Sequence, residues 1–407
     1  MRITRHDFSA AIVKRLLTWR VFRFLAGVQV FKVAEVGAAG KTSSTLLPAS
    51  NGVCSIPVYS NGGGIGKKLV RTFPHLRAWD IPNAGVSLNH RFSCVFQASE
   101  LLISDRMEPP PFRVFRAGAA AYRTANIVGQ SEDLVFVRKP TYYSRVETLL
   151  YVGTRATYNW SHFLIDFLPG LHIANRFGAL PKHIPVVVPK SLLHADHFVE
   201  LLRVVADGRK ILAIGEDEVI EADRVIWVDP PAYGGPFTEH DELREPLVWH
   251  RDAMASYRDF LTSRVKPVLS PLDSSPSRRI YLTRPDGRRS PVVENLTTIL
   301  KDYRFDTVDM AMLDLAEKIE LMSTVTHVVS PAGSGLANVL FARPGVKVLA
   351  FTDNRAPSFD NFVPNLVDLV EGTLSIFAAK DRVTVASGER YELREDLIRA
   401  QLKAFVA

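Results

Sequence analysis

Three short stretches of this sequence carry side chains that could bind or transfer a charged group. The first is NWSHFLIDFLPGL, residues 159–171, in which His162 and Asp166 are four residues apart. Helical spacing places these two side chains next to each other, on a face opposite an apolar stripe. Such a pair suits proton transfer, but an exposed His–Asp pair on the solvated side of a buried helix has the same spacing. Pro169 lies on the same face and removes a backbone hydrogen bond, which favours a functional edge over a plain solvated helix.

The second stretch is VVSPAGSGLAN, residues 328–338, which predicts a buried strand, a tight turn and a helix. Gly333 and Gly335 permit the turn, and Ser334 can cap the helix or bond a phosphate oxygen. The first backbone N–H groups of the helix carry the positive end of its dipole and favour an anion. An anion site and a ligand-free turn are both consistent with this segment taken alone.

The third stretch is SRRIYLTRPDGRRSPVVEN, residues 277–295, which contains five arginines around a predicted strand. Arg284 ends the strand, and Arg288 and Arg289 close the turn that follows. Guanidinium groups at the carboxyl end of a strand suit bidentate binding of a diphosphate. A solvated turn or a nucleic-acid patch could be equally rich in arginine. Arg284 is the strongest candidate because it lies where the apolar strand gives out.

Length and composition predict a globular protein of two domains. The chain has 407 residues, of which 47% are hydrophobic and 23% charged, and this composition excludes an intrinsically disordered protein. The net charge of +7 fits an anionic ligand, an anionic membrane surface or nucleic acid. Two cysteines, Cys54 and Cys94, exclude a disulfide framework and favour a reducing compartment.

Alternating strand and helix patterns predict the domain organisation. We expect an N-terminal α/β domain over residues 1–238, β-rich over 86–157, and a C-terminal Rossmann-like domain over 239–385. The final helix, 386–407, is expected to pack back toward the first domain. Residues 46–90 are rich in Gly, Pro and Asn and predict long loops with short strands. Two α/β halves predict a cleft between them, and ligands of open parallel sheets bind beyond the carboxyl ends of the strands.

Taken together, the three stretches resemble glycosyltransferase family 61. Bacterial members carry a pattern like N-Y-x-H-W-L-x-D-x-L-P, an S-R-R stretch after a strand and a loop of the form G-P-H-G-A-G-L-x-N. The resemblance covers roughly residues 150–350, with the motifs in the same order. The matching residues here are Asn159, Trp160, His162, Phe163, Leu164, Asp166, Leu168 and Pro169, then the arginine stretch Arg284–Arg289, and finally Ser330, Pro331, Gly333, Ser334, Gly335, Leu336 and Asn338.

The resemblance implies a GT-B-like α/β fold, in which two Rossmann-like domains face a cleft. It also implies an inverting hexosyl- or pentosyltransferase that moves a sugar from a nucleotide sugar to a glycan or glycoconjugate acceptor, in capsular or other bacterial surface-polysaccharide synthesis and without nucleic acid as a partner. The catalytic base would be Asp166 or His162. The residues implied for donor binding are Arg284, Arg288, Arg289, Gly333, Ser334, Gly335 and Asn338.

Two sequence features qualify this implied activity. No Asp-x-Asp motif occurs, so we expect no metal or other cofactor, and protein groups would stabilise the leaving diphosphate. Ala332 stands where many relatives have His, and Val293 replaces an Asn that often follows the arginine cluster. These departures leave a second hypothesis open, a catalytically degenerate nucleotide- or glycan-binding protein of the same fold.

The N-terminal segment at residues 11–32 is basic and amphipathic, without the unbroken apolar core of a signal peptide. It could form a helix packed on its own domain, lie on an anionic membrane surface or be an organellar transit peptide. We expect a cytoplasmic protein that could be peripheral to the inner membrane through this helix.

Overall fold

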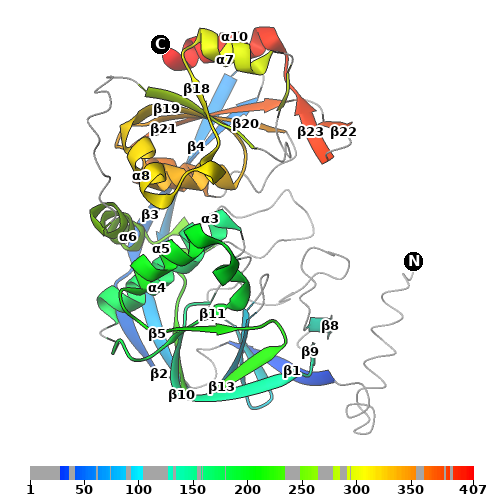
Figure 1. Cartoon of the computed structure of the whole chain (residues 1–407), viewed down its shortest axis with the longest axis vertical. Coiled ribbons are helices and arrows are strands. Elements are labelled where there is room, and N and C mark those ends of the chain that lie inside the picture. Colours follow the sequence, from blue (N-terminus) through cyan, green and yellow to red (C-terminus); the bar gives the residue numbers. More distant parts are fainter. Residues whose placement is uncertain are drawn as a thin grey trace. The chain divides into compact units, whose positions relative to one another are not determined.

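The computed structural model divides the chain into two compact units (Figure 1). The first unit contains residues 1–48 and 75–240, and the second contains residues 49–74 and 241–407. The division after residue 240 lies close to the expected domain boundary, but residues 49–74 belong to the second unit. The structure describes residues 28–35, 42–60, 63–73, 75–88, 93–103, 127–131, 134–153, 157, 159–178, 180–233, 248–264, 278–284, 291–293, 295–353, 362–379, 382–385 and 388–407.

An eleven-stranded sheet forms the core of the first unit, in the order β12-β11-β10-β13-β5-β6-β7-β1-β9-β8 with β2 paired to β5. Its strands are β1 (Val28–Glu35), β2 (Thr42–Leu47), β5 (Leu76–Leu88), β6 (Ser93–Gln97), β7 (Glu100–Ile103), β8 (Ile127–Ser131), β9 (Leu134–Arg138), β10 (Tyr142–Tyr151), β11 (Val186–Pro189), β12 (Ile211–Ile214) and β13 (Glu218–Val228), and the short β14 (Ala232–Tyr233) follows.

Only part of this sheet is Rossmann-like. Strands β12, β11, β10 and β13 pair in parallel, whereas the pairs β13–β5, β5–β6 and β6–β7 are antiparallel. The expectation of a Rossmann-like N-terminal domain is therefore correct for the four parallel strands and wrong for the rest. Strands β5, β6 and β7 follow one another through short connections, which permit only antiparallel neighbours, whereas β1 pairs with β7 in parallel and with β9 in the antiparallel sense.

Helices of the first unit follow the parallel strands. After β10 come α3 (Trp160–His162), the π-helix η2 (Phe163–Phe167) and α4 (Leu168–Phe177), and after β11 come η3 (Lys190–His194) and α5 (Asp196–Ala206). Leu164, Leu171 and Leu201 are among the buried apolar residues of these helices, whereas Leu193 of η3 is 40% exposed. Trp79, Tyr151 and other side chains of β5, β10 and β13 form the main core cluster of the sheet.

The second unit contains a five-stranded parallel sheet in the order β18-β16-β19-β20-β21. Its elements are β15 (Val248–Trp249), α6 (Arg251–Arg264), β16 (Arg278–Leu282), β17 (Pro291–Val292), α7 (Leu296–Asp302), β18 (Asp306–Val308), η5 (Met310–Met312), α8 (Leu315–Thr324), β19 (Val325–Pro331), η6 (Ser334–Phe341), β20 (Lys347–Asp353), α9 (Val363–Leu369), β21 (Thr373–Ala379), β22 (Arg382–Val385), β23 (Gly388–Glu392) and α10 (Glu395–Val406). A Rossmann-like sheet was expected in this half of the chain.

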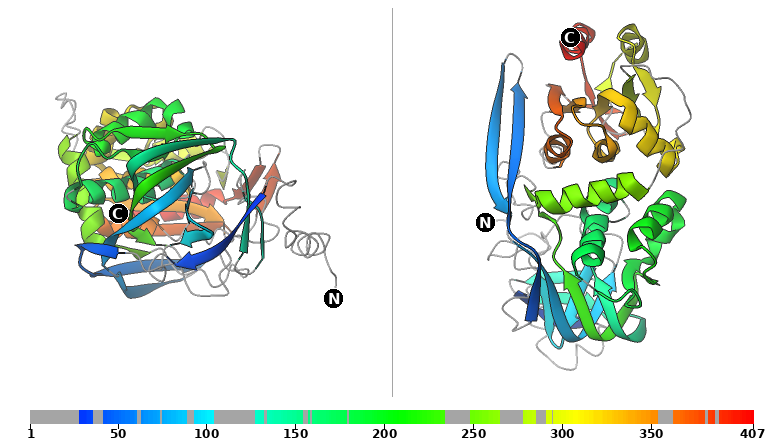
Figure 2. Two further views of the ribbon diagram at one scale, coloured as in Figure 1. Left: turned by 90° about the horizontal axis from the view of Figure 1, so that it is seen from below. Right: turned by 90° about the vertical axis from the view of Figure 1, so that its left-hand side faces the viewer.

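The prediction of long loops over residues 46–90 is wrong. Strands β3 (Ser50–Ser60) and β4 (Gly63–Phe73) pair along their whole length as a long hairpin, visible in blue in the right-hand view of Figure 2. The glycines that suggested turns lie within the ladder, where backbone pairing holds them extended. Strand β3 runs beside α9 and β21 of the same unit.

The C-terminal helix α10 packs on the core of the second unit. The expected packing of this helix toward the first domain stays a prediction. Ile398, Leu402 and Phe405 join the core cluster that contains Ile299 and Phe305. These three positions have helical spacing and form one apolar stripe, which the second unit's own core covers.

The expected N-terminal helix at residues 11–32 falls mostly outside the described residues, and residues 28–32 form the start of strand β1. No described helix has the length and apolarity that a membrane span requires.

Candidate functional site

The strand order of the second unit defines one candidate site. Counted along the chain, the order β18-β16-β19-β20-β21 is 2-1-3-4-5, so connections leave β16 toward one side and reach β19 on its other side. In such sheets the ligand crevice lies at this switch point, beyond the carboxyl ends of the two strands. Thr283 and Arg284 follow β16 there, and Ala332 and Gly333 follow β19.

Arg284 and the glycine loop are in direct contact at this switch point. Nη1 of Arg284 donates to the carbonyl oxygen of Ala332 at 3.4 Å. Gly333 has φ +156°, and a Cβ placed on it would lie 2.5 Å from the same Nη1. A side chain at position 333 would therefore displace the guanidinium, so the glycine is what permits this approach.

Backbone hydrogen bonds fix the two loops. The amide of Ala332 donates to the carbonyl of Phe351 at 2.7 Å, and the amide of Thr283 donates to Val308 at 2.8 Å. The side chain of Ala332 is only 4% exposed, so this position contributes its backbone to the crevice. The site is thus built on the ends of two hydrogen-bonded strands, and the side chain of Arg284 contacts the loop that follows β19.

The helix after the loop differs in type from the prediction. Residues Ser334–Phe341 form a 3-10 helix whose N-cap is Gly333, so Ser334 is its first residue and not its cap. Asn338 is buried, and its side-chain amide donates to the carbonyl of Gly335 at 2.8 Å. This bond positions the turn at the start of the helix, where the first N–H groups lack intrahelical acceptors.

The remaining arginines of the predicted donor site, Arg288 and Arg289, lie outside the described residues. Val293 is described and packs against the core cluster of the second unit. A structural role for this residue therefore accounts for its apolar character.

The second candidate site is the His162–Asp166 pair of the first unit. Nδ1 of His162 lies 2.6 Å from Oδ2 of Asp166, and the two side chains are 32% and 14% exposed. The pair is therefore partly buried, unlike a freely solvated pair. A carboxylate on Nδ1 fixes the tautomer of the ring and leaves Nε2 as the basic nitrogen.

A π-helical turn lies at this pair, with His162 directly before it and Asp166 inside it, where Pro169 predicts a break in the α-helix. The amide of Leu168 donates to Phe163, five residues back, and Pro169 stands in the first turn of α4. The wider turn accommodates a proline that has no N–H to donate. Inserted π turns in helices occur frequently at functional sites. Asn159 caps the helix by accepting from the amide of Ser161 at 3.0 Å.

The pair follows a switch point of its own. Strand β10 lies between β11 and β13, and the chain continues from β10 through these helices to β11. His162 is therefore in the first turns beyond the carboxyl end of β10, where an open parallel sheet places a ligand.

Sequence reasoning missed a buried carboxylate at the same edge of the sheet. Asp229 directly follows β13 and is fully buried, with Oδ1 accepting from Nε1 of Trp79 at 2.9 Å and Oδ2 from the backbone amide of Arg77 at 3.0 Å. Its signal in the sequence is an Asp between an apolar strand and two prolines. These bonds tie the ends of β13 and β5 together, so Asp229 supports the edge without being exposed on it.

Within the described ranges, no three His, Cys, Asp or Glu side chains group closely enough to hold a metal ion. The polar groups that the two candidate sites offer are the Arg284 guanidinium, backbone amides and the His–Asp pair.

Comparison with known proteins gives one finding. The family model described as Glycosyltransferase 61 matches residues 160–349, from the start of α3 to strand β20. This span contains the His–Asp pair, Arg284 and the glycine loop. No curated protein matches the chain.

Proposed function

Residues 160–349 belong to glycosyltransferase family 61, and from that premise we propose that the chain is an inverting, metal-independent glycosyltransferase with a nucleotide-sugar donor. The family implies glycosyl transfer. The observation that carries the finer proposal is the contact of Arg284 with the glycine loop at the switch point of the second unit.

The donor's diphosphate would bind at this switch point. Departure of the nucleotide leaves negative charge on the diphosphate, which positive groups held in advance stabilise most effectively. Arg284 supplies a guanidinium fork, and the loop Gly333–Gly335 supplies backbone amides at a helix start. Arg288, Arg289 and Ser334 would add contacts, while Asn338 would position the loop through its bond to Gly335.

The acceptor hydroxyl would lose its proton to the His–Asp pair. Inversion needs one displacement, in which the hydroxyl oxygen attacks the anomeric carbon and the nucleotide diphosphate leaves from the opposite face. Asp166 can take the proton directly, or His162 can take it at Nε2 with Asp166 holding the ring. The 2.6 Å separation of the two side chains supports either assignment.

The wider setting belongs to the same proposal. It includes a GT-B-like arrangement, a glycan or glycoconjugate acceptor, a hexose or pentose as the transferred sugar, and a role in capsular or other bacterial surface-polysaccharide synthesis. It also includes a cytoplasmic location, with the basic N-terminal segment as a peripheral membrane contact. Support comes from the bacterial-type motif around His162 and from the basic character of residues 11–32.

Thermal unfolding with UDP, GDP, CMP and CDP tests the donor site. One nucleotide at one hundred times its dissociation constant should stabilise the folded chain by about 2.7 kcal/mol. Arg284→Ala should remove most of this stabilisation. Arg278→Ala is the matched control, because Arg278 is exposed at the opposite, amino end of the same strand. Equal stabilisation of the Arg284 variant would contradict the proposal.

Turnover separates the enzyme from a degenerate binding protein. The enzyme should release nucleotide from the donor that binds, with EDTA present or absent. The degenerate alternative predicts tight nucleotide binding without cleavage of any nucleotide sugar, even when glycan acceptors are present. The alanine at position 332 favours this alternative.

A further inference from the structure

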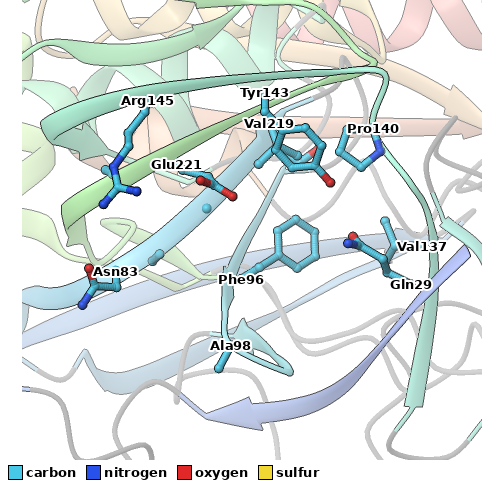
Figure 3. Close-up of a pocket in the computed structure, with 14 residues that line it drawn as sticks. Gln29, Asn83, Phe96, Ala98, Val137, Pro140, Tyr143, Arg145, Val219 and Glu221 are labelled. Carbon is cyan, nitrogen blue, oxygen red and sulfur yellow. The ribbon is translucent and has the colours of Figure 1, made fainter.

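A separate cavity of about 340 Å³ opens on the sheet of the first unit (Figure 3). Strands β5, β6, β10 and β13 form most of its walls, and residues of β1 and β9 complete it. The rings of Tyr143 and Phe96 lie in its middle, with Gln29 on one side and Arg145 and Asn83 on the other. Neither candidate site described above includes any of these residues.

The lining carries aromatic faces and planar polar groups without excess charge. Arg145 and Glu221 contribute one charge of each sign. The guanidinium of Arg145 also pairs with Asp223, with 2.5 Å between Nη2 and Oδ1. Because the arginine's charge is already compensated, the cavity is poorly suited to a phosphate. Amide, carboxylate and guanidinium groups beside aromatic rings suit a neutral ligand that has many hydroxyls and an apolar C–H face.

The backbone at the cavity is strained at two lining residues, Asn83 and Ala98, and Ala98 has φ +50°. Asn83 has φ +48° inside strand β5, although its neighbours Pro82 and Ala84 keep their pairing with Arg224 and Ala222. The side-chain amide of Gln97 also donates to the carbonyl of Pro82 at 2.6 Å. Strained non-glycine residues held by surrounding structure gather at ligand sites.

The cavity is far from the His–Asp pair along the sheet. Tyr143 is near the amino end of β10, whereas His162 follows its carboxyl end. The eight residue-to-residue steps from Tyr143 to Tyr151 span about 26 Å at the usual rise of a strand. A ligand here therefore cannot be the sugar that reacts at His162 or Asp166.

We propose that this cavity binds a neutral saccharide segment of a long acceptor, remote from the reacting hydroxyl. The inference rests on the proposed glycosyltransferase activity, because it supplies the reason for a second sugar site. Tyr143, half exposed, would stack on the C–H face of one sugar ring, and Glu221 and Asn83 would bond its hydroxyls. The acceptor would thereby be selected by structure beyond its terminal residue.

A glycan array carrying neutral and anionic oligosaccharides tests this proposal with the full chain. Wild-type protein should bind a set of neutral glycans, and Tyr143→Ala should weaken that binding about tenfold. Tyr142→Ala is the matched control. Tyr142 is the adjacent tyrosine, 64% exposed against 53% for Tyr143, and strand alternation directs it to the other face of the sheet. It should bind as wild type does.

Three results would overturn the inference: no neutral glycan bound, only anionic glycans bound, or equal binding by the Tyr143 variant and wild type. Failure of the proposed function is recognised separately, because nucleotide stabilisation depends on Arg284 in the other unit. A chain that binds nucleotide through Arg284 but fails the array test refutes only the saccharide cavity. Unchanged thermal unfolding of Tyr143→Ala establishes that any loss of binding is local.

Discussion

Replacement of Gly333 by alanine tests the donor site through a single methyl group. The added Cβ would lie 2.5 Å from Nη1 of Arg284, closer than non-bonded atoms approach, and 3.4 Å from Cζ, which is an ordinary contact distance. Because the loop is tied to β20 through the bond from Ala332 to Phe351, the flexible arginine moves and the backbone stays. The guanidinium would thus leave the position at which it meets the loop.

Two costs follow, and they are measured differently. With φ +156° and ψ −172°, Gly333 is in a region that only glycine adopts readily, so alanine should cost about 1–3 kcal/mol of folding free energy. Displacement of a guanidinium that pairs with a diphosphate should cost a further 2–4 kcal/mol of binding, or about 30- to 1,000-fold in nucleotide affinity. The first cost appears in urea unfolding without ligand, and the second only in a nucleotide titration.

Gly345→Ala is the control that separates strain from displacement. Gly345 also has a positive φ, +81°, but an added Cβ there would meet nothing within 4 Å. This variant should lose about 1 kcal/mol of stability and keep its nucleotide affinity. Should Gly333→Ala bind the nucleotide within about twofold of wild type, the reasoning that joins Arg284, Gly333 and the diphosphate is refuted.

Two further predictions concern the two candidate bases, Asp166 and His162, and the buried histidines. Asp166→Asn should lower turnover by about 10²- to 10⁴-fold with nucleotide affinity intact, and His162→Ala should do the same if the imidazole takes the proton. Steady-state kinetics measure turnover, and a nucleotide titration measures affinity. Wild-type rates in both variants would place the base elsewhere. Burial lowers the pKa of His172 to about 4, and burial together with Arg279 and Lys347 lowers that of His327 to about 4. Since both values are below the ordinary 6.5, the unfolded chain binds more protons than the folded one, so stability should be complete above pH 6.5 and decline as the pH falls toward 4. Urea unfolding across that range measures the decline, which His327→Gln should reduce; a flat profile would contradict the assignment.

Local patterns were sufficient to predict many elements of the second unit. The apolar runs that precede Arg284 and Gly333 are strands β16 and β19, and a capping box between Asp314 and Glu317, itself a local sequence signal, begins α8. The sequence pattern that predicts each of these elements lies within the element or a few residues from it. The long β3–β4 hairpin does not, because its pairing depends on residues up to 23 apart while its glycines favour a turn reading.

The candidate sites likewise combine features that a local sequence pattern predicts with features that depend on distant residues. Sequence alone marks Arg284 and Gly333 as the ends of two strands, but they are 49 positions apart, and their contact depends on β19 pairing with β16. That pairing comes from the 2-1-3-4-5 order, which no local pattern encodes because several helix lengths and crossovers fit the same strands. The π turn at Phe163–Phe167 is different in kind. Pro169 predicts that a regular α-helix must fail there, whereas the form of the failure depends on burial of the side chains around it. The sequence therefore identifies candidate functional residues individually, whereas the fold determines which of them lie together in one site.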